Sequence, residues 1–280
     1  MFVGSVGDPR IPSNQHAVDI LLGIRFGLDL YVNQRPVKLL DARLCPLKGR
    51  SEPDVNFVIF RENTEGAYVG LGGNFKRDTA DEIAVQEDVN TRQGVERILI
   101  YAFEYARRRG LTRVCMSDKS NAMPYGHGLW QRTFAEVRQR YPEIVSWHLY
   151  VDTLAMEMLR DPSQFEVIVT CNMFGDILSD LGAQLVGGLG VAPSANIHPG
   201  RISMFEPVHG SAPNLAGKDL ANPMAAILAA GMMLDYLGFT EVAAEIEDTV
   251  AKALHGDKMT PDPGGTLGTR AAGDWICTQL

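Results

Sequence analysis

Short apolar runs that alternate with helix-like segments constrain the fold of this chain more than any other feature of its sequence. Residues 55–60 (VNFVIF) and 167–171 (VIVTC) have the length and composition of buried strands. Between them, residues 94–109 carry apolar side chains at the spacing of one helix face, and Gly110 follows as a helix stop. Strands separated by helices are typical of a sheet covered on both faces, so we predict the α/β class.

Further segments continue this alternation. We expect strands at 1–7, 82–88, 113–116 and 146–150, and helices at 17–31, 130–141, 154–160, 176–185, 224–237 and 242–254. Apolar and polar residues alternate along 82–88, which predicts an exposed strand. The sequence holds no internal repeat, so a second domain would have to arise from the chain crossing between two lobes.

Charge and cysteine usage exclude several classes of protein. The net charge of -8 disfavours binding of nucleic acid by bulk electrostatics. The four cysteines form no CxxC pair, which predicts neither a zinc ribbon nor a disulfide framework and fits a reducing compartment. No apolar run approaches the ~20 residues that span a bilayer, and the N-terminus lacks a signal-peptide pattern. We expect a cytoplasmic protein with neither nucleic acid nor membrane as a partner.

Three arginines form a candidate site for an acidic ligand. Arg25 and Arg35 lie ten residues apart, and Arg61 directly follows the 55–60 strand. Arginine forks bind carboxylates in a bidentate manner, and ligands of α/β sheets bind where strands end. The alternative is that these arginines cover a solvated face.

Two aspartates form a candidate metal site. Asp176 and Asp180 are four residues apart, which places both carboxylates on one helix face, where they repel unless a cation lies between them. Mg²⁺ or Mn²⁺ would suit such oxygen ligands, and Asp152, just after the 146–150 strand, is a plausible third. The alternative is that Asp176 caps the helix while Asp180 is merely exposed.

Two further features could take part in chemistry. Lys119 follows the 113–116 strand, where a lysine near a metal and arginines could act as a base, and Tyr68 is a second candidate proton carrier. Taken alone, a residue of either kind is more often structural. The loop 206–214 (EPVHGSAPN) offers polar groups for a nucleotide, although it is neither a GxGxxG motif nor a P-loop.

Taken together, these segments resemble the β-decarboxylating dehydrogenase family, which includes isopropylmalate, isocitrate, homoisocitrate and tartrate/D-malate dehydrogenases. The resemblance runs almost end to end, and its order and spacing are more specific than any single motif. The matching segments are Arg25, NQRP at 33–36, RENTEGAY at 61–68, DKSN at 118–121, the run 172–180, the loop 206–213 and ANP at 221–223.

The resemblance implies a role for each candidate residue. It implies that Arg25, Arg35, Arg61, Asn121 and Asp152 bind the substrate, that Asp152, Asp176 and Asp180 hold Mg²⁺ or Mn²⁺, that Lys119 and Tyr68 carry protons, and that Glu206, His209, Gly210, Ser211, Ala212, Asn214 and Asn222 bind the cofactor. Asn214 stands where NAD-dependent members usually have aspartate, and the lysine-tyrosine pair of some NADP enzymes is missing. NAD is therefore the expected cofactor.

The resemblance also implies an isopropylmalate-dehydrogenase-like two-domain fold. Residues 1–30 and 187–280 would form a large cofactor domain, and 31–186 a small domain for dimerisation, substrate and metal. Lys119 and Asp152 would reach across a homodimer into the partner's site, so that a monomer would be inactive. Family members carry a strand and a Gly-Asp-Gly-Ile-Gly-Pro loop ahead of the segment that matches 1–7, so we expect an N-terminally truncated version of the fold.

Three substrates remain open at this point. Leu21 and Leu22 stand where isopropylmalate enzymes place leucines, and the segments 7–9 and 260–265 also favour 3-isopropylmalate. The segments 45–47, 62–73 and 122–125 look more like D-malate/tartrate enzymes, which we rank second. The serine typical of isocitrate enzymes is missing, so isocitrate ranks third. A non-catalytic or truncated subunit of the same fold is the competing alternative.

Overall fold

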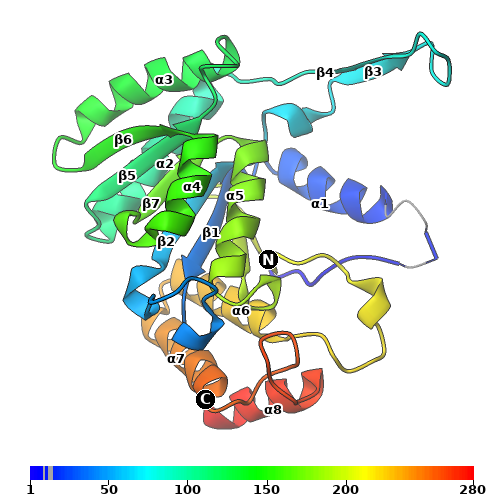
Figure 1. Cartoon of the computed structure of the whole chain (residues 1–280), viewed down its shortest axis with the longest axis vertical. Coiled ribbons are helices and arrows are strands. Elements are labelled where there is room, and N and C mark those ends of the chain that lie inside the picture. The colour runs from blue at the N-terminus through cyan, green and yellow to red at the C-terminus, as the bar shows by residue number, and fades with distance from the viewer. Residues whose placement is uncertain (9, 12–14) are drawn as a thin grey trace.

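A computed structural model describes residues 1–8, 10–11 and 15–280. Seven strands form one mixed sheet in the order β6-β5-β7-β2-β1-β8-β9 (Figure 1), which confirms the predicted α/β class. The strands are β1 (Val32–Lys38), β2 (Asn56–Glu62), β5 (Arg113–Asp118), β6 (Val145–Tyr150), β7 (Val167–Thr170), β8 (Pro193–Ile197) and β9 (Ser203–Pro207), while β3 (Gly72–Phe75) and β4 (Ile83–Gln86) form a separate hairpin. That hairpin extends away from the body of the molecule (Figure 1).

Helices cover both faces of the sheet. They are α1 (Gln15–Gly27), α2 (Arg92–Arg108), α3 (Gly126–Val137), α4 (Val151–Arg160), α5 (Asn172–Leu185), α6 (Met224–Tyr236), α7 (Thr240–His255) and α8 (Thr269–Gln279). None of the helices in the described part of the chain is both long and apolar enough to cross a membrane.

The alternation of side chains along β2 shows that helices α2 and α5 lie on opposite faces of the sheet. Strand β2 runs parallel to β7 and antiparallel to β1, with Arg35 opposite Ile59. Arg61 points toward α5, where it contacts Asn172, whereas the neighbouring Phe60 packs its ring against Tyr101 of α2. Successive strand residues face opposite sides. The odd-numbered residues of both strands therefore face the side of the sheet that α5 covers, and the even-numbered residues face the opposite side, where α2 packs against β2.

Helix α2 shows why the sequence folds as it does. Thr91 caps its start by accepting a hydrogen bond from the Gly94 amide at 3.0 Å, and Gly110 adopts a left-handed conformation (φ 67°) just past its end. Its apolar stripe is completely buried, as the spacing predicts: Val95, Ile98, Leu99, Ala102, Phe103 and Ala106. Each large side chain of this stripe contributes about 1.5–3 kcal/mol through burial.

Several predicted boundaries were wrong. The predicted strand at 1–7 is reduced to a single bridge between Phe2 and Phe205 on the edge of β9. The predicted helix at 17–31 ends at Gly27, and the chain turns at Asp29 (φ 48°). The predicted helix at 130–141 lies at Gly126–Val137, and the one at 176–185 begins a turn earlier, at Asn172. Pro9 of the 7–9 motif lies outside the described residues.

A single sheet joins both predicted domains. Strand β8, from the predicted large domain, pairs antiparallel with β1 of the predicted small domain, with Asn196 opposite Asn33. This pairing makes β1 the strand through which the two parts of the sheet connect. The division into residues 1–30 with 187–280 and 31–186 stays a prediction.

Candidate active site

Five of the predicted residues meet near the carboxyl end of β2, around the carboxylate of Asp176. Its Oδ2 accepts a hydrogen bond from the Tyr68 hydroxyl at 3.0 Å, and its Oδ1 pairs with Nη1 of Arg61 and, at 3.3 Å, with Nη1 of Arg35. The same Arg35 nitrogen lies 3.5 Å from Oδ1 of Asp180. Strands β1 and β2, the loop after β2 and helix α5 thus contribute to one charged cluster.

The first turn of α5 explains how this cluster is built. Asn172 accepts a hydrogen bond from Nε of Arg61 at 2.9 Å and donates one to the Glu65 carbonyl at 2.8 Å. Any side chain at Gly175 would place its Cβ about 2.5 Å from Cβ of Arg61, so only glycine lets the helix approach the strand this closely. The sequence Asn-Met-Phe-Gly-Asp therefore sets Asp176 against the Arg61 fork.

Burial and neighbouring charges together set the pKa values of the cluster. The Arg61 side chain is only 2% exposed, and this burial, together with the nearby charge of Arg35, lowers its pKa to about 9, which still leaves the guanidinium protonated at neutral pH. Burial by itself would raise the pKa of Asp176, but Arg61 and Arg35 outweigh it and hold that pKa below the ordinary value. Burial raises the pKa of Asp180 above its usual range. The two carboxylates are thus driven apart in acidity.

In one chain, the cation between the two carboxylates is Arg35. Asp176 does not cap α5, because the helix starts four residues earlier. No group of three His, Cys, Asp or Glu side chains among the described residues is arranged to hold a metal ion. Asp176 and Asp180 offer the oxygen ligands that a hard divalent cation prefers, so their donor type fits Mg²⁺ or Mn²⁺. One chain supplies only these two of the three predicted carboxylates at this place.

Lys119 and Asp152 form a second, separate pair. They follow β5 and β6, and the Lys119 ammonium lies 2.8 Å from Oδ1 of Asp152, whose pKa this hydrogen bond lowers. Asn121 is exposed on the loop after Lys119. The structure thus brings Lys119 and Asp152 into contact with each other.

Arg25, a predicted substrate residue, forms an ion pair with Glu206, a predicted cofactor residue. Nη2 of Arg25 donates to Oε1 of Glu206 at 3.0 Å, and both side chains are almost buried. Glu206 also accepts from the amide of Asn196 at 2.8 Å, and Asn196 in turn accepts from Asn63 at 3.0 Å. Sequence reasoning missed this buried amide chain; the available signal was an amide side chain within a strand of otherwise apolar and small residues.

The remaining cofactor predictions fall at two places. The loop after β9 carries His209, Gly210, Ser211, Ala212 and Asn214, which are half-buried or exposed. Ala212 has a left-handed backbone (φ 41°), and the Ser5 hydroxyl lies 3.1 Å from Nδ1 of His209. Asn222 is buried at the start of α6, where it accepts from the Met224 amide and donates to Asp262. Its amide is thus already used within the protein.

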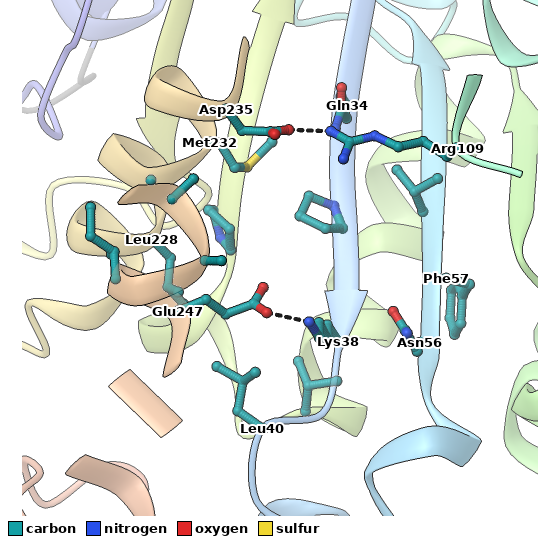
Figure 2. A pocket seen from close by; sticks show the side chains of 18 of the residues that line it. Gln34, Lys38, Leu40, Asn56, Phe57, Arg109, Leu228, Met232, Asp235 and Glu247 are labelled. Atoms are coloured by element: carbon teal, nitrogen blue, oxygen red, sulfur yellow. Dashed lines mark hydrogen bonds and ion pairs between the residues drawn. The ribbon is translucent and has the colours of Figure 1, made fainter. Parts of the chain in front are cut away.

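A hollow lies on the other face of the sheet. Figure 2 shows this cavity of about 460 Å³ between β1 and helices α6 and α7, with Gln34 and Lys38 on its strand wall. Its lining includes no predicted site residue. The charged groups drawn there are paired, Lys38 with Glu247 and Arg109 with Asp235. The charged cluster around Asp176 therefore remains the candidate site on chemical grounds.

Comparison with known proteins gives consistent matches. A family model described as isocitrate/isopropylmalate dehydrogenase matches residues 1–276. The chain is 43% identical to 3-isopropylmalate dehydrogenase of Thermobifida fusca, covering 100% of this chain and 79% of that protein. It is 42% identical to the decarboxylating D-malate dehydrogenase of Escherichia coli K12, covering 99% of this chain and 79% of that one. The crystal structure of isocitrate dehydrogenase from Methylococcus capsulatus superimposes with a TM-score of 0.89 at 38% identity, covering 99% and 80% of the two chains.

Proposed function

Since this chain belongs to the isocitrate/isopropylmalate dehydrogenase family, we propose that it oxidises and decarboxylates a 2-hydroxy diacid with NAD as the hydride acceptor. The favoured substrate is 3-isopropylmalate, which gives several of the similar relatives their name. Leu21 and Leu22 support this choice, since both are half-buried on α1, the helix that carries Arg25.

The observation that carries the proposal is the set of buried guanidinium groups around Asp176. Arg35 of β1 and Arg61 near the carboxyl end of β2 are buried, and each contacts the carboxylate of Asp176. Nε of Arg25 and Nε of Arg35 are buried and find no hydrogen-bond acceptor among the described residues. Buried donors without acceptors are costly, and the carboxylates of a diacid would satisfy them.

A divalent metal would be held by Asp176 and Asp180 together with Asp152 of a second copy of the chain. When bound, Mg²⁺ or Mn²⁺ would lower the pKa of the substrate hydroxyl and stabilise the negative charge left after carbon dioxide departs. The carboxylates supply the negative charge that this cation needs, and Arg35 would then be freed from both of them.

Two side chains would move the protons. Lys119, in its neutral amine form, would accept the proton of the substrate hydroxyl, and a bound nicotinamide would supply the hydride acceptor. Tyr68 would then donate a proton to the carbon that has lost carbon dioxide. Burial and the Asp176 carboxylate raise the pKa of Tyr68 above its ordinary value, so its hydroxyl holds a proton at neutral pH and can serve as an acid.

The cofactor would lie along the loop after β9. Glu206, His209, Gly210, Ser211 and Ala212 line its start, with Asn214 and Asn222 beyond them, and the exposed Asn214 amide could hydrogen-bond the ribose hydroxyls of NAD. An asparagine there lacks the charge with which aspartate rejects a 2′-phosphate, so NAD preference would rest on the missing lysine-tyrosine pair.

A homodimer with shared sites completes the proposal. The exposed side chains of Ile177 on α5 (59%) and Met156 on α4 (62%) are apolar, and Ile177 directly follows Asp176. A second copy that covers these helices would bury both side chains and bring its own Lys119 and Asp152 toward the cluster. The four free cysteines agree with a cytoplasmic location.

The decisive test is NADH formation by the purified chain with Mg²⁺ or Mn²⁺. 3-Isopropylmalate, D-malate, tartrate and isocitrate are offered in parallel, with EDTA and the Lys119→Ala variant as controls. We expect turnover of 3-isopropylmalate that EDTA and the substitution abolish. Preference for D-malate would favour the second candidate, which the Escherichia coli relative supports. A folded dimer that turns over none of the four acids would contradict the proposal and favour a non-catalytic subunit.

A further inference from the structure

We infer that His127 is a positioning residue. Its unprotonated Nδ1 fixes the backbone of Lys119, so that the lysine side chain is held in position to accept the proton of the substrate hydroxyl. This inference rests on the proposed function, because it assigns Lys119 the role of base. It concerns a histidine on α3, away from the charged cluster around Asp176.

Hydrogen bonds hold the peptide groups of Lys119 on both sides. Its amide donates to Nδ1 of His127 at 2.8 Å, and its carbonyl accepts from the amides of Ala122 at 3.0 Å and Met123 at 2.8 Å. The preceding Asp118 is completely buried and accepts from the Ser120 amide at 2.9 Å. The backbone at Lys119 therefore has little freedom, while its ammonium group reaches out to Asp152.

The surroundings of His127 fix its tautomer. The side chain is 1% exposed, and Nδ1 can accept the Lys119 amide proton only while it carries no proton itself. The proton then sits on Nε2, which faces Asp88 at 3.7 Å. Burial lowers the pKa of His127 although Asp88 and Asp118 oppose this shift, so the ring is neutral at neutral pH.

The same ring contacts the helix that carries the aspartates. It packs edge-on against Phe174 of α5 at a centroid distance of 5.2 Å, and Phe174 lies two residues before Asp176. His127 thus touches both the Lys119 loop and the helix of Asp176 and Asp180. In the proposed dimer Lys119 serves the partner's aspartates, so this ring would connect the two shared sites.

The competing explanation is that His127 merely fills space in the core. Three substitutions separate the two roles. In His127→Asn the amide oxygen can take the place of Nδ1, in His127→Gln the amide reaches the place of Nε2, and His127→Leu fills similar volume without any acceptor. If the Nδ1 bond matters, Asn retains function while Gln and Leu lose it. If volume matters, Leu is the mildest change.

Two readouts test this series on the dimer of this chain. The first is kcat and KM with the acid that the wild type turns over. We expect His127→Leu and His127→Gln to lower kcat by about 10- to 100-fold with KM changed less than about threefold, and His127→Asn to recover most of kcat. The second is hydrogen exchange of a peptide that contains the Lys119 amide, which we expect to become at least about tenfold faster with Leu and Gln than with Asn.

The outcomes are distinguishable. Thermal stability and dimer mass of all three variants are measured alongside, since kcat that simply follows stability would overturn the inference in favour of packing. Better activity with Gln than with Asn would overturn it in favour of the Asp88 contact. If the wild type turns over no acid, the proposed function fails, and equal exchange rates in Asn and Leu variants would independently refute the Nδ1 bond.

Discussion

Asp176 depends on three side chains that lie far from it in the sequence. Arg61 reaches it through Nη1 while its Nε donates to Asn172, and Tyr68 and Arg35 complete the set. A fork of this kind makes two bonds in a fixed plane, which a lysine ammonium cannot reproduce. The geometry of the site therefore rests on the residue type at position 61 as well as on its charge.

Arg61→Lys tests this dependence. The substitution keeps the positive charge but gives up at least one of the two charged hydrogen bonds. We therefore expect kcat/KM to fall roughly 30-fold, which corresponds to a loss of about 2 kcal/mol in transition-state stabilisation. Steady-state kinetics with the preferred acid measures it. Arg92→Lys is the matched control, because Arg92 pairs with Glu136 at the surface and should change kcat/KM less than about twofold. Equal effects at both positions would contradict the argument.

Glu62, next to Arg61, makes stability depend on pH. It is buried, and burial raises its pKa to about 7 even though Thr64 and the Glu65 amide donate hydrogen bonds to it and Arg97 lies 3.7 Å away. A raised carboxyl pKa means that the native state binds the proton more tightly than the unfolded chain. Its stabilising contribution is complete below the unfolded pKa and is lost as pH rises through the folded one.

We therefore expect the difference in unfolding free energy between the wild type and Glu62→Gln to change by about 3 kcal/mol between pH 4.5 and 7.5. The wild type should lose stability relative to the variant over this range. Urea unfolding at several pH values measures it, with the exposed Glu143→Gln as control. Parallel pH curves for the wild type and Glu62→Gln would show that folding does not raise the pKa of Glu62.

At the scale of elements, the sequence predicted the parts whose periodicity is strong. Helix α2 and strands β2, β5, β6 and β7 lie close to where their apolar patterns place them. Strand β1 (VNQRPVK) was missed because its buried positions hold Asn33 and Arg35, and burial of such groups depends on partners elsewhere in the chain. Their hydrogen bonds to Ser194 and Ser179 cannot be seen in a local pattern.

The same limit applies to the site. Sequence alone placed Arg61 at a strand end and paired Asp176 with Asp180, because both facts follow from local spacing. It could not reveal that Arg35 lies between the two aspartates, since this requires the pairing of β1 with β2 and the packing of α5 on both.

The β3–β4 hairpin carries an apolar face that none of the described residues covers. Phe75 pairs with Ile83 and Gly73 with Val85, so Phe75, Ile83, Val85 and Leu71 share one face, while Asn74 and Ala84 lie on the other. The Phe75 side chain is 63% exposed. In the proposed homodimer, a second copy would cover this face.

We expect Val85→Asn to weaken the dimer by at least about tenfold in dissociation constant, because it puts an amide on the apolar face. Ala84→Asn, on the opposite face of the same strand, should leave the constant unchanged. Sedimentation equilibrium measures both. Identical constants for the two variants would show that the hairpin takes no part in dimer contacts.

At the scale of the whole molecule, the proposed site is divided between two groups of residues. Lys119 and Asp152 pair at the ends of β5 and β6, whereas Asp176 and Asp180 lie on α5 beside β1 and β2. If Lys119 serves the partner's aspartates, each site needs Lys119 from one chain and Asp180 from the other. A chain without Lys119 and a chain without Asp180 can then still form one complete site between them.

Dimers of defined composition, isolated with two affinity tags, test this division. A dimer of one Lys119→Ala chain and one Asp180→Asn chain keeps one intact shared site, so we expect about half of the wild-type activity. A dimer that carries both substitutions on one chain, beside a wild-type chain, has a defect in each shared site and should be inactive. If Lys119 serves its own chain, the results reverse: the first dimer is inactive, and the second retains the intact site of its wild-type chain.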